Sequence, residues 1–177
     1  METIYLAGGC FWCTEAVYRS LKGVLIVTPG YMGGHTPNPT YHEVVQGDTG
    51  HAETIKVEYD SKIISTEQIL RVFFDSHDPT TLDRQGADVG SQYRSAIFYT
   101  GHEQRDVAFL LITELNKKLP EGKRVVTEVQ LAPEFFTAED YHHGFYAENP
   151  EKMYCQVVIT PKIKKLEKDY EHLIHKK

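Results

Sequence analysis

The sequence lacks the features of a membrane, secreted or nucleic-acid-binding protein. It has no apolar run near the roughly 18 residues that a membrane span needs, and its first residues hold no basic segment of a secretory signal. Its net charge is −6, whereas nucleic acids and anionic lipid surfaces attract basic proteins. We therefore expect a cytoplasmic protein that binds neither nucleic acid nor membrane.

Cysteine is also scarce, with three residues in the whole chain. An odd and small number argues against a disulfide scaffold and favours reactive or redox-active thiols in a reducing compartment. A zinc site needs two matched pairs of ligands. Cys155 stands alone, with no histidine spaced to pair with it, so the sequence predicts no metal site.

The chain of 177 residues, 41% hydrophobic and 25% charged, fits one globular domain covering residues 1–177. Strand patterns alternate with helix patterns, which predicts an α/β or α+β fold. The segment 51–59 alternates polar and apolar residues, so Glu53 shares the face of a strand with apolar residues. We also expect long polar loops at 29–41 and 78–90, a last strand at 154–160 and a C-terminal helix at about 161–177.

The rest of the chain is organised around residues 8–15. A short strand ends at two glycines, Cys10 follows, and a helical pattern begins directly behind it. The first amides and the dipole of a helix favour negative charge at its N-terminus, where the pKa of a thiol falls. Cys10 is therefore predicted to be a nucleophile rather than a packed structural cysteine. Phe11 and Trp12, the only tryptophan, are placed to form the wall of an apolar pocket.

Cys10 and Cys13 form a C-x-x-C motif. Three residues apart on a helix, their β-carbons would lie about 5–6 Å from each other, a separation that a disulfide can bridge with little strain.

These residues resemble the signature of the peptide methionine sulfoxide reductase A family, in which residues 9–12 and Glu15 match. Further blocks resemble the family in the family's order, so that the resemblance covers about residues 5–165: residues 30–34, 38–41, 49–53, 77–80, 85–86, 88–95 and 139–142. The resemblance implies a mixed β-sheet packed by helices in a ferredoxin-like two-layer sandwich. It also implies reduction of the S epimer of methionine sulfoxide, free or in proteins.

The resemblance also implies roles for individual residues. Cys10 would be the nucleophile, and Phe11 and Trp12 would hold the methyl group of the sulfoxide. The groups around the sulfoxide oxygen would be Glu53, Tyr41 and Tyr93, with Asp88 supporting them. The physical chemistry agrees, because the departing oxygen needs a proton, and a carboxyl group that burial keeps protonated can supply it near neutral pH.

The expected cycle leaves a sulfenic acid on Cys10, which a second thiol converts to a disulfide. An external dithiol reductant such as thioredoxin would open that disulfide, with no metal or organic cofactor. The candidates for the second thiol are Cys13 and Cys155. Many family members use a distal cysteine near a glycine-rich tail, but residues 149–155 are one residue longer and lack a glycine. Local spacing favours Cys13.

Two other functions remain as alternatives. A general thiol–disulfide oxidoreductase would use the C-x-x-C motif, but it has no use for Glu53 and two loop tyrosines. A non-catalytic module could bind methionine side chains in the pocket beside Phe11 and Trp12, and its packed thiols would resist alkylation. His142 and His143 are expected to pack near the aromatic segment.

Overall fold

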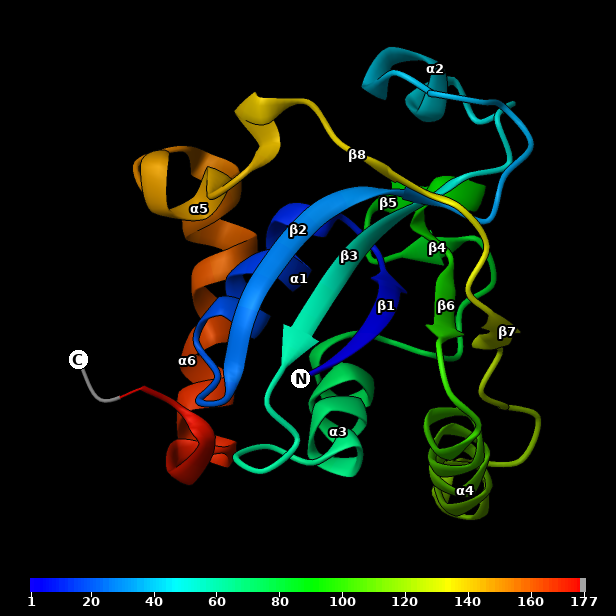
Figure 1. The fold of residues 1–177 in the computed structure, drawn as a ribbon, viewed down its shortest axis with the longest axis vertical. Coiled ribbons are helices and arrows are strands. Elements are labelled where there is room, and N and C mark those ends of the chain that lie inside the picture. Colours follow the sequence, from blue (N-terminus) through cyan, green and yellow to red (C-terminus); the bar gives the residue numbers. More distant parts are fainter. Residues whose placement is uncertain (176–177) are drawn as a thin grey trace.

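The computed structural model describes residues 1–175. Its central unit runs β1 (Glu2–Gly8), α1 (Phe11–Arg19), β2 (Val24–Met32), β3 (Ala52–Tyr59), α3 (Thr66–Ser76) and β6 (Ser95–Tyr99). These four strands lie in the order β6-β1-β3-β2, and all the neighbours are antiparallel. This βαββαβ arrangement is the predicted ferredoxin-like one, and it confirms the predicted fold class (Figure 1).

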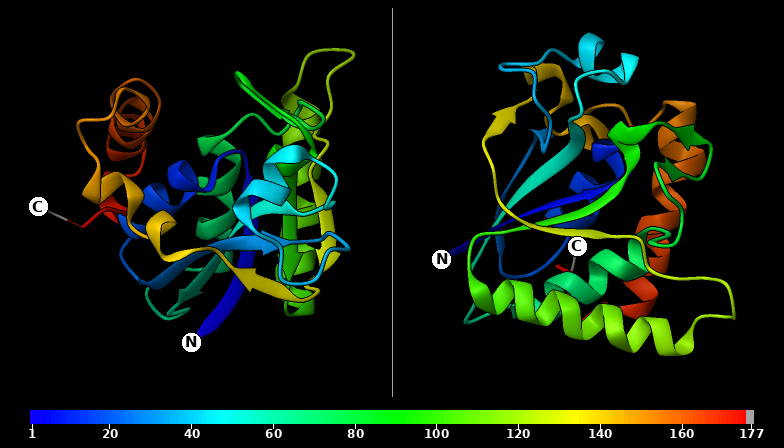
Figure 2. Two further views of the ribbon diagram at one scale, coloured as in Figure 1. Left: turned by 90° about the horizontal axis from the view of Figure 1, so that it is seen from above. Right: turned by 90° about the vertical axis from the view of Figure 1, so that its right-hand side faces the viewer.

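Two short strands extend the sheet. β7 (Glu128–Leu131) lies parallel to β6, and β8 (Phe135–Thr137) lies antiparallel to β2, which gives six strands in one mixed sheet. The long helix α4 (His102–Lys118) and the C-terminal helix α6 (Thr160–Asp169) lie at opposite sides of the molecule (Figure 2). The remaining elements are α2 (Tyr41–Gln46), the hairpin of β4 (Arg84–Gln85) and β5 (Asp88–Val89), and α5 (Phe145–Glu148).

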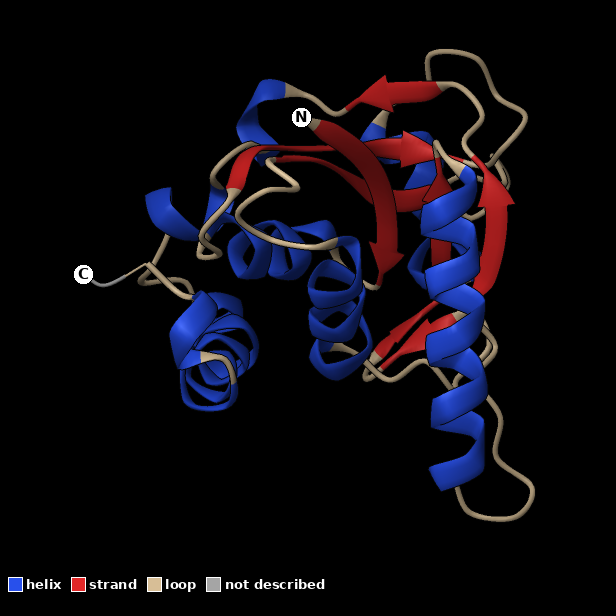
Figure 3. Cartoon of the chain, turned by 60° about the horizontal axis from the view of Figure 1, so that its bottom comes forward, coloured by secondary structure: helices blue, strands red, loops and turns tan. Residues whose placement is uncertain are grey.

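The main core lies between the curved sheet and helices α1 and α3 (Figure 3). The residues of β3 that face these helices are Ile55, Val57 and Tyr59, as the period of two predicts, and Glu53 continues the same face. Fully burying one such large apolar side chain contributes about 1.5–3 kcal/mol. A carboxyl group has thereby been placed at the end of an apolar row.

The predicted strand at 154–160 is wrong, because this segment is helical. Residues Cys155–Ile159 form a π-helical stretch that continues into α6. Cys155 and Ile159 are both fully buried beside Cys13 of α1, whereas Val157 between them is exposed, which is the spacing of a helix. Packing against α1 therefore outweighs the strand preference of the β-branched run.

The wide helical turn is held by Thr160, whose backbone N–H and Oγ1 both donate to the Cys155 carbonyl, the latter at 3.0 Å. Pro161 follows at the start of α6, where its missing N–H is tolerated. The helix ends at Asp169 and not near 177. Beyond it a 3₁₀ turn leads to Ile174, which bridges to Leu21, and residues 176–177 lie outside the described part.

Several boundaries also differ from the predictions. β2 continues to Met32 through the Pro29–Gly30 pair, which was expected in a loop, because β8 supplies a strand on its open edge. β6 begins at Ser95, directly after the 3₁₀ turn that Tyr93 ends and the single residue Arg94. No helix in residues 1–175 combines the length and the apolar character needed to cross a membrane.

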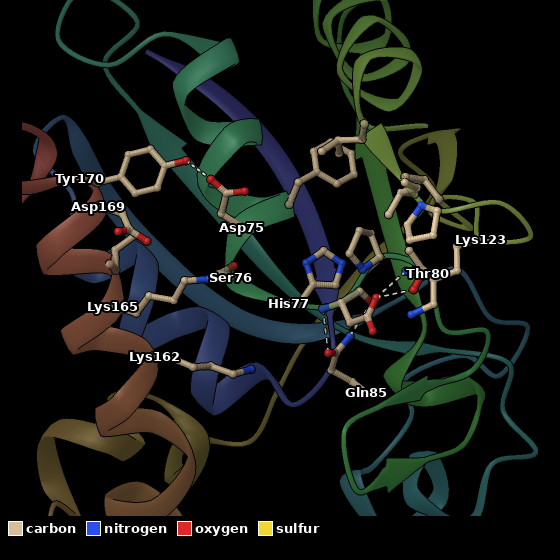
Figure 4. A pocket seen from close by; sticks show the side chains of 18 residues that line it. Asp75, Ser76, His77, Thr80, Gln85, Lys123, Lys162, Lys165, Asp169 and Tyr170 are labelled. Carbon is tan, nitrogen blue, oxygen red and sulfur yellow. Dashed lines mark hydrogen bonds between the residues drawn. The ribbon is translucent and has the colours of Figure 1, made fainter. Parts of the chain in front are cut away.

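A cavity of about 590 Å³ opens between α3, α6 and the segment after α4 (Figure 4). Lysines from two elements, Lys123 and Lys162, approach it, and Tyr170 donates a hydrogen bond to Asp75 at its rim. Its lining includes none of the predicted site residues. The candidate site lies instead around the N-terminus of α1.

Candidate active site at the start of helix α1

Cys10 is the N-cap residue of α1, as the strand–glycine–helix pattern predicts. Its carbonyl accepts hydrogen bonds from the amides of Cys13 and Thr14, at 3.1 and 3.4 Å. The preceding Gly9 has a φ of +89°, which permits the tight turn, and a side chain there would collide with Gln85. Cys10 is partly exposed. The local sequence therefore places the thiol at an accessible helix start.

The surroundings of Cys10 nevertheless raise the pKa of its thiol. Burial is the largest cause, and the neighbouring Glu53 carboxylate and Cys13 act in the same direction. The sequence predicted a lowered pKa from the helix terminus alone. The structure reverses that expectation, because the cost of placing a thiolate beside a carboxylate in an apolar site exceeds the help of the helix.

Glu53 lies directly beside this cysteine. Its Oε2 accepts a hydrogen bond from the backbone N–H of Phe11 at 3.0 Å, although only 2% of the residue is exposed. Burial raises the pKa of the carboxyl group to about 8, and the hydrogen bond from Phe11 offsets part of that rise. The carboxyl group is therefore largely protonated at neutral pH and can donate its proton.

Tyr41, the first residue of α2, and Tyr93, the last residue of a 3₁₀ turn, are far apart in the sequence, and both lie close enough to Glu53 to be affected by its charge. Burial, followed by the charge of Glu53, raises the pKa of Tyr41 to about 12. The same two causes, with a contribution from Tyr41, raise the pKa of the Tyr93 hydroxyl. Both hydroxyls therefore stay protonated and act as neutral hydrogen-bond donors. Both residues are partly exposed, and the structure brings Tyr41, Tyr93 and Glu53 together, the three groups that the resemblance places around the sulfoxide oxygen.

An aromatic wall adjoins these polar groups. The Trp12 indole is stacked on Phe145, with centroids 3.8 Å apart and planes 5° from parallel, and remains partly exposed. Phe11 has no exposed surface and packs against Tyr41 and His142. Trp12 thus forms the accessible part of the wall, and Phe11 supports it from inside.

Tyr154 connects the cysteines with Asp88. Its hydroxyl lies 3.7 Å from the Cys13 sulfur and 3.5 Å from Asp88 Oδ2. Cys13 is buried, and burial raises the pKa of its thiol. Cys155 is fully buried in the same apolar cluster as Cys13, and all three cysteines are free thiols.

Within residues 1–175, no group of three or more histidine, cysteine, aspartate or glutamate side chains is placed to hold a metal ion.

A sequence model described as "Peptide methionine sulfoxide reductase" matches residues 2–174 of the chain. The chain belongs to this family. The predicted resemblance is thereby confirmed, and membership makes the protein an oxidoreductase that acts on methionine sulfoxide.

Individual relatives of the reductase family agree. The chain is 55% identical over 168 residues to a peptide methionine sulfoxide reductase MsrA of Saccharolobus solfataricus, which covers 95% of this chain and 94% of the relative. It resembles the reduced form of Mxr1 from Saccharomyces cerevisiae with a TM-score of 0.79 and 34% identity, covering 87% and 88% of the two chains. A structure of Mxr1 in complex with Trx2 aligns with a TM-score of 0.56 and 24% identity over 81% and 84%, which shows the fold alone.

Sequence reasoning missed several residues that build this reductase site. Glu139 accepts hydrogen bonds from the Tyr31 hydroxyl at 2.9 Å and from the Tyr41 backbone at 3.0 Å, and so fixes the start of α2. Tyr154 was expected on a strand. The signal available for Glu139 was its membership in the block 139–142, which matched the reductase family without indicating a contact.

Proposed function

We propose that this protein reduces the S epimer of methionine sulfoxide to methionine, with Cys10 as nucleophile and Glu53 as general acid. The substrates are free methionine sulfoxide and oxidised methionines in proteins. One observation carries the proposal: a buried carboxyl group with a pKa raised to about 8 adjoins the residue that follows Cys10. That pKa is suited to proton donation near neutral pH.

In the first step, the Cys10 sulfur attacks the sulfoxide sulfur while Glu53 gives its proton to the sulfoxide oxygen. The sulfoxide is reduced to a thioether, the oxygen ends as the hydroxyl of a Cys10 sulfenic acid, and the thiol proton restores Glu53. General acid catalysis of this kind contributes about 10²–10⁴-fold. The raised pKa of Cys10 means that its proton leaves only as the oxygen becomes protonated.

Substrate orientation falls to the residues around this pair. The hydroxyls of Tyr41 and Tyr93 donate to the sulfoxide oxygen without adding charge to the site. Asp88 has a supporting role, as it accepts a hydrogen bond from the Tyr154 hydroxyl, which also lies beside Cys13. Trp12 forms the wall for the methyl group, and Phe11 is its inner part. An apolar wall on one side and donors on the other select one epimer, because the mirror arrangement would exchange methyl group and oxygen.

We assign Cys13 as the thiol that resolves the sulfenic acid. It condenses with Cys10, releasing one water and forming a disulfide. Cys13 lies one helical turn from Cys10, and its amide donates to the Cys10 carbonyl. Cys155 is the alternative, but it is fully buried on a helix that would have to move for it to reach Cys10. The proximity of Cys13 favours it.

An external dithiol returns the disulfide to two thiols, and we propose thioredoxin or a similar protein as that reductant. Mxr1 of Saccharomyces cerevisiae has been observed in complex with Trx2. The reaction as written needs no metal or organic cofactor. We further propose that residues 1–177 form one catalytic domain and that the protein works in the cytoplasm.

The test is reduction of the separate S and R epimers of a methyl aryl sulfoxide, with dithiothreitol as reductant. Wild type should consume the S epimer and spare the R epimer, and Cys10→Ser should be inactive. Consumption of the R epimer, or activity of folded Cys10→Ser, would overturn the assignment. An inert wild type that binds methionine peptides would instead indicate a binding module.

A further inference from the structure

His142 contacts the only tryptophan of the chain through a hydrogen bond. The Trp12 indole N–H donates to His142 Nδ1 at 3.0 Å, although 130 residues separate the two. Their rings also lie 5.8 Å apart, and the histidine has no exposed surface. The indole of the site is therefore held by a specific polar contact as well as by packing.

This hydrogen bond fixes the protonation of the histidine. An indole nitrogen only donates, so Nδ1 must carry the lone pair and the neutral ring must carry its proton on Nε2. Nε2 is buried and has no hydrogen-bond partner within residues 1–175. Leaving a buried donor without a partner destabilises the folded state, so a buried group of this kind needs an explanation. A phenylalanine would fill similar space without that cost, which leaves the acceptor at Nδ1 as the reason for a histidine.

The His142 ring also contacts other residues of the candidate active site. The centroid of the His142 ring lies 4.9 Å from that of Phe11 and 4.5 Å from that of Tyr41. His142 therefore adjoins both the aromatic wall and a tyrosine that is proposed to donate a hydrogen bond to the sulfoxide oxygen. Phe145, three residues after His142 in the chain, is stacked on the Trp12 indole. The indole is thus held by stacking on Phe145 and by hydrogen bonding to His142.

The segment 142–145, which contains His142 and Phe145, is hydrogen-bonded to α1. Buried Glu15 accepts the Gly144 N–H with both carboxylate oxygens, at 2.9 and 3.1 Å. The segment that holds Trp12 and the helix that carries Trp12 are therefore anchored to each other.

We propose that His142 is a positioning residue that sets the orientation of the Trp12 indole and, through it, the shape of the methyl pocket. The inference rests on the proposed function, because it takes Trp12 as the wall for the substrate methyl group. It assigns His142 no contact with the reacting atoms.

The decisive comparison uses His142→Phe, which keeps the ring and loses the acceptor, and His142→Asn, whose amide oxygen restores an acceptor near Nδ1. His143→Asn is the matched control, since that histidine bonds the Ala138 carbonyl instead. The first readout is the fluorescence of Trp12 without substrate. His142→Phe should shift the emission, while His142→Asn and His143→Asn should resemble wild type. An unchanged spectrum in His142→Phe would overturn the proposal.

The second readout separates positioning from catalysis. In His142→Phe, KM for a methionine sulfoxide peptide should rise about five- to tenfold, the change expected for one ordinary hydrogen bond, and kcat should change less. His142→Asn should recover most of the loss. An equal fall of kcat in both variants with KM unchanged would contradict the proposal. A wild type without activity would reject the proposed function, and fluorescence would still decide whether His142 orients Trp12.

A third readout needs only folded wild type and His142→Asn. Protonated His142 has no lone pair for the indole, so acidification should change Trp12 emission in wild type and leave that of His142→Asn unchanged. Burial lowers the pKa of His142, with Glu139 raising it and His143 lowering it; the tyrosines that face the ring, Tyr41 and Tyr141, stay neutral. An identical acid transition in both proteins would overturn the proposal, even if His142→Phe failed to fold.

Discussion

Glu53 Oε2 lies 3.0 Å from the backbone nitrogen of Phe11, so a side chain of β3 caps the helix that begins beside Cys10. The antiparallel β1–β3 pair produces this contact, because β1 runs into α1 at the end of the pair where β3 begins, and Glu53 is the second residue of β3. The carboxyl group is held by one of the free amides at a helix start. It is nevertheless buried strongly enough for its pKa to rise to about 8.

Replacing Glu53 by glutamine should lower the rate of sulfoxide reduction by about 10²–10⁴-fold, because the side chain keeps its size and loses the acidic proton. The measurement is single-turnover release of methionine. The control is Glu58→Gln on the same strand, where the carboxylate pairs with Lys56 near the surface and a change of less than twofold, about 0.4 kcal/mol, is expected. Equal losses in both variants would show that Glu53 acts through the strand rather than as an acid.

The difference in stability between wild type and Glu53→Gln should depend on pH, and its sign follows from the raised pKa of Glu53. The folded state raises the pKa of Glu53 from 4.5 to about 8, so between these values the folded protein binds a proton that the unfolded chain has lost. Its contribution to stability is present below pH 4.5 and is lost as pH rises toward 8. Glu53→Gln should therefore gain Tm relative to wild type from about pH 5 to about pH 9. A constant Tm difference in thermal unfolding would contradict the raised pKa.

Much of this site could be predicted from local pattern. The strand–glycine–helix sequence places Cys10 at a helix start, and the period of two places Glu53 on the buried face of β3. The approach of Tyr41 and Tyr93 to that carboxyl group could be predicted only through the family resemblance, since the start of α2 and the 3₁₀ turn that carry them are placed by contacts between residues far apart in the sequence. The raised pKa of Cys10 depends on its three-dimensional neighbours and not on the helix terminus.

The errors in the predicted fold also arise from contacts between residues far apart in the sequence. Residues 154–160 favour a strand by composition, and only the packing of Cys155 and Ile159 against α1 makes them helical. Residues Phe135–Thr137 form the short strand β8 because the edge of β2 offers unpaired backbone groups. In both segments, contacts with distant elements determine the secondary structure, and local sequence preference does not predict it.

Cys13→Ser should stop the formation of an intramolecular disulfide after one turnover with sulfoxide, and Cys155→Ser should still form Cys10–Cys13. The reason is proximity, since Cys10 and Cys13 share the first turn of α1. Mass spectrometry of peptides from protein treated without reductant identifies the pair. A Cys10–Cys155 bond in Cys13→Ser, formed as fast as the wild-type disulfide, would transfer the resolving role to Cys155.

Glu15→Met should lower stability more than Glu67→Met, although both glutamates form i,i+4 pairs with arginine. The side chain of Glu15 is 2% exposed and that of Glu67 is 51% exposed. Removing Glu15 leaves the Gly144 N–H without its acceptor, at a cost of about 1–3 kcal/mol, whereas a surface pair contributes at most about 1 kcal/mol. Denaturant unfolding measures both, and equal losses would mean that the Gly144 contact adds nothing.

Alkylation of Cys10 should be slow near neutral pH in the free protein, because burial raises the pKa of its thiol, and above about pH 8 the ionised Glu53 carboxylate raises it further. Glu53→Gln removes the charge and should speed alkylation at about pH 9, where the wild-type carboxyl group is ionised, with a much smaller effect at about pH 6. Iodoacetamide labelling of a Cys13→Ser, Cys155→Ser background isolates the Cys10 signal. Fast labelling of wild type at about pH 7 would instead mean that the helix start dominates, which would restore the expectation drawn from the sequence. The pH at which the two proteins diverge then reports the ionisation of Glu53 independently of any sulfoxide.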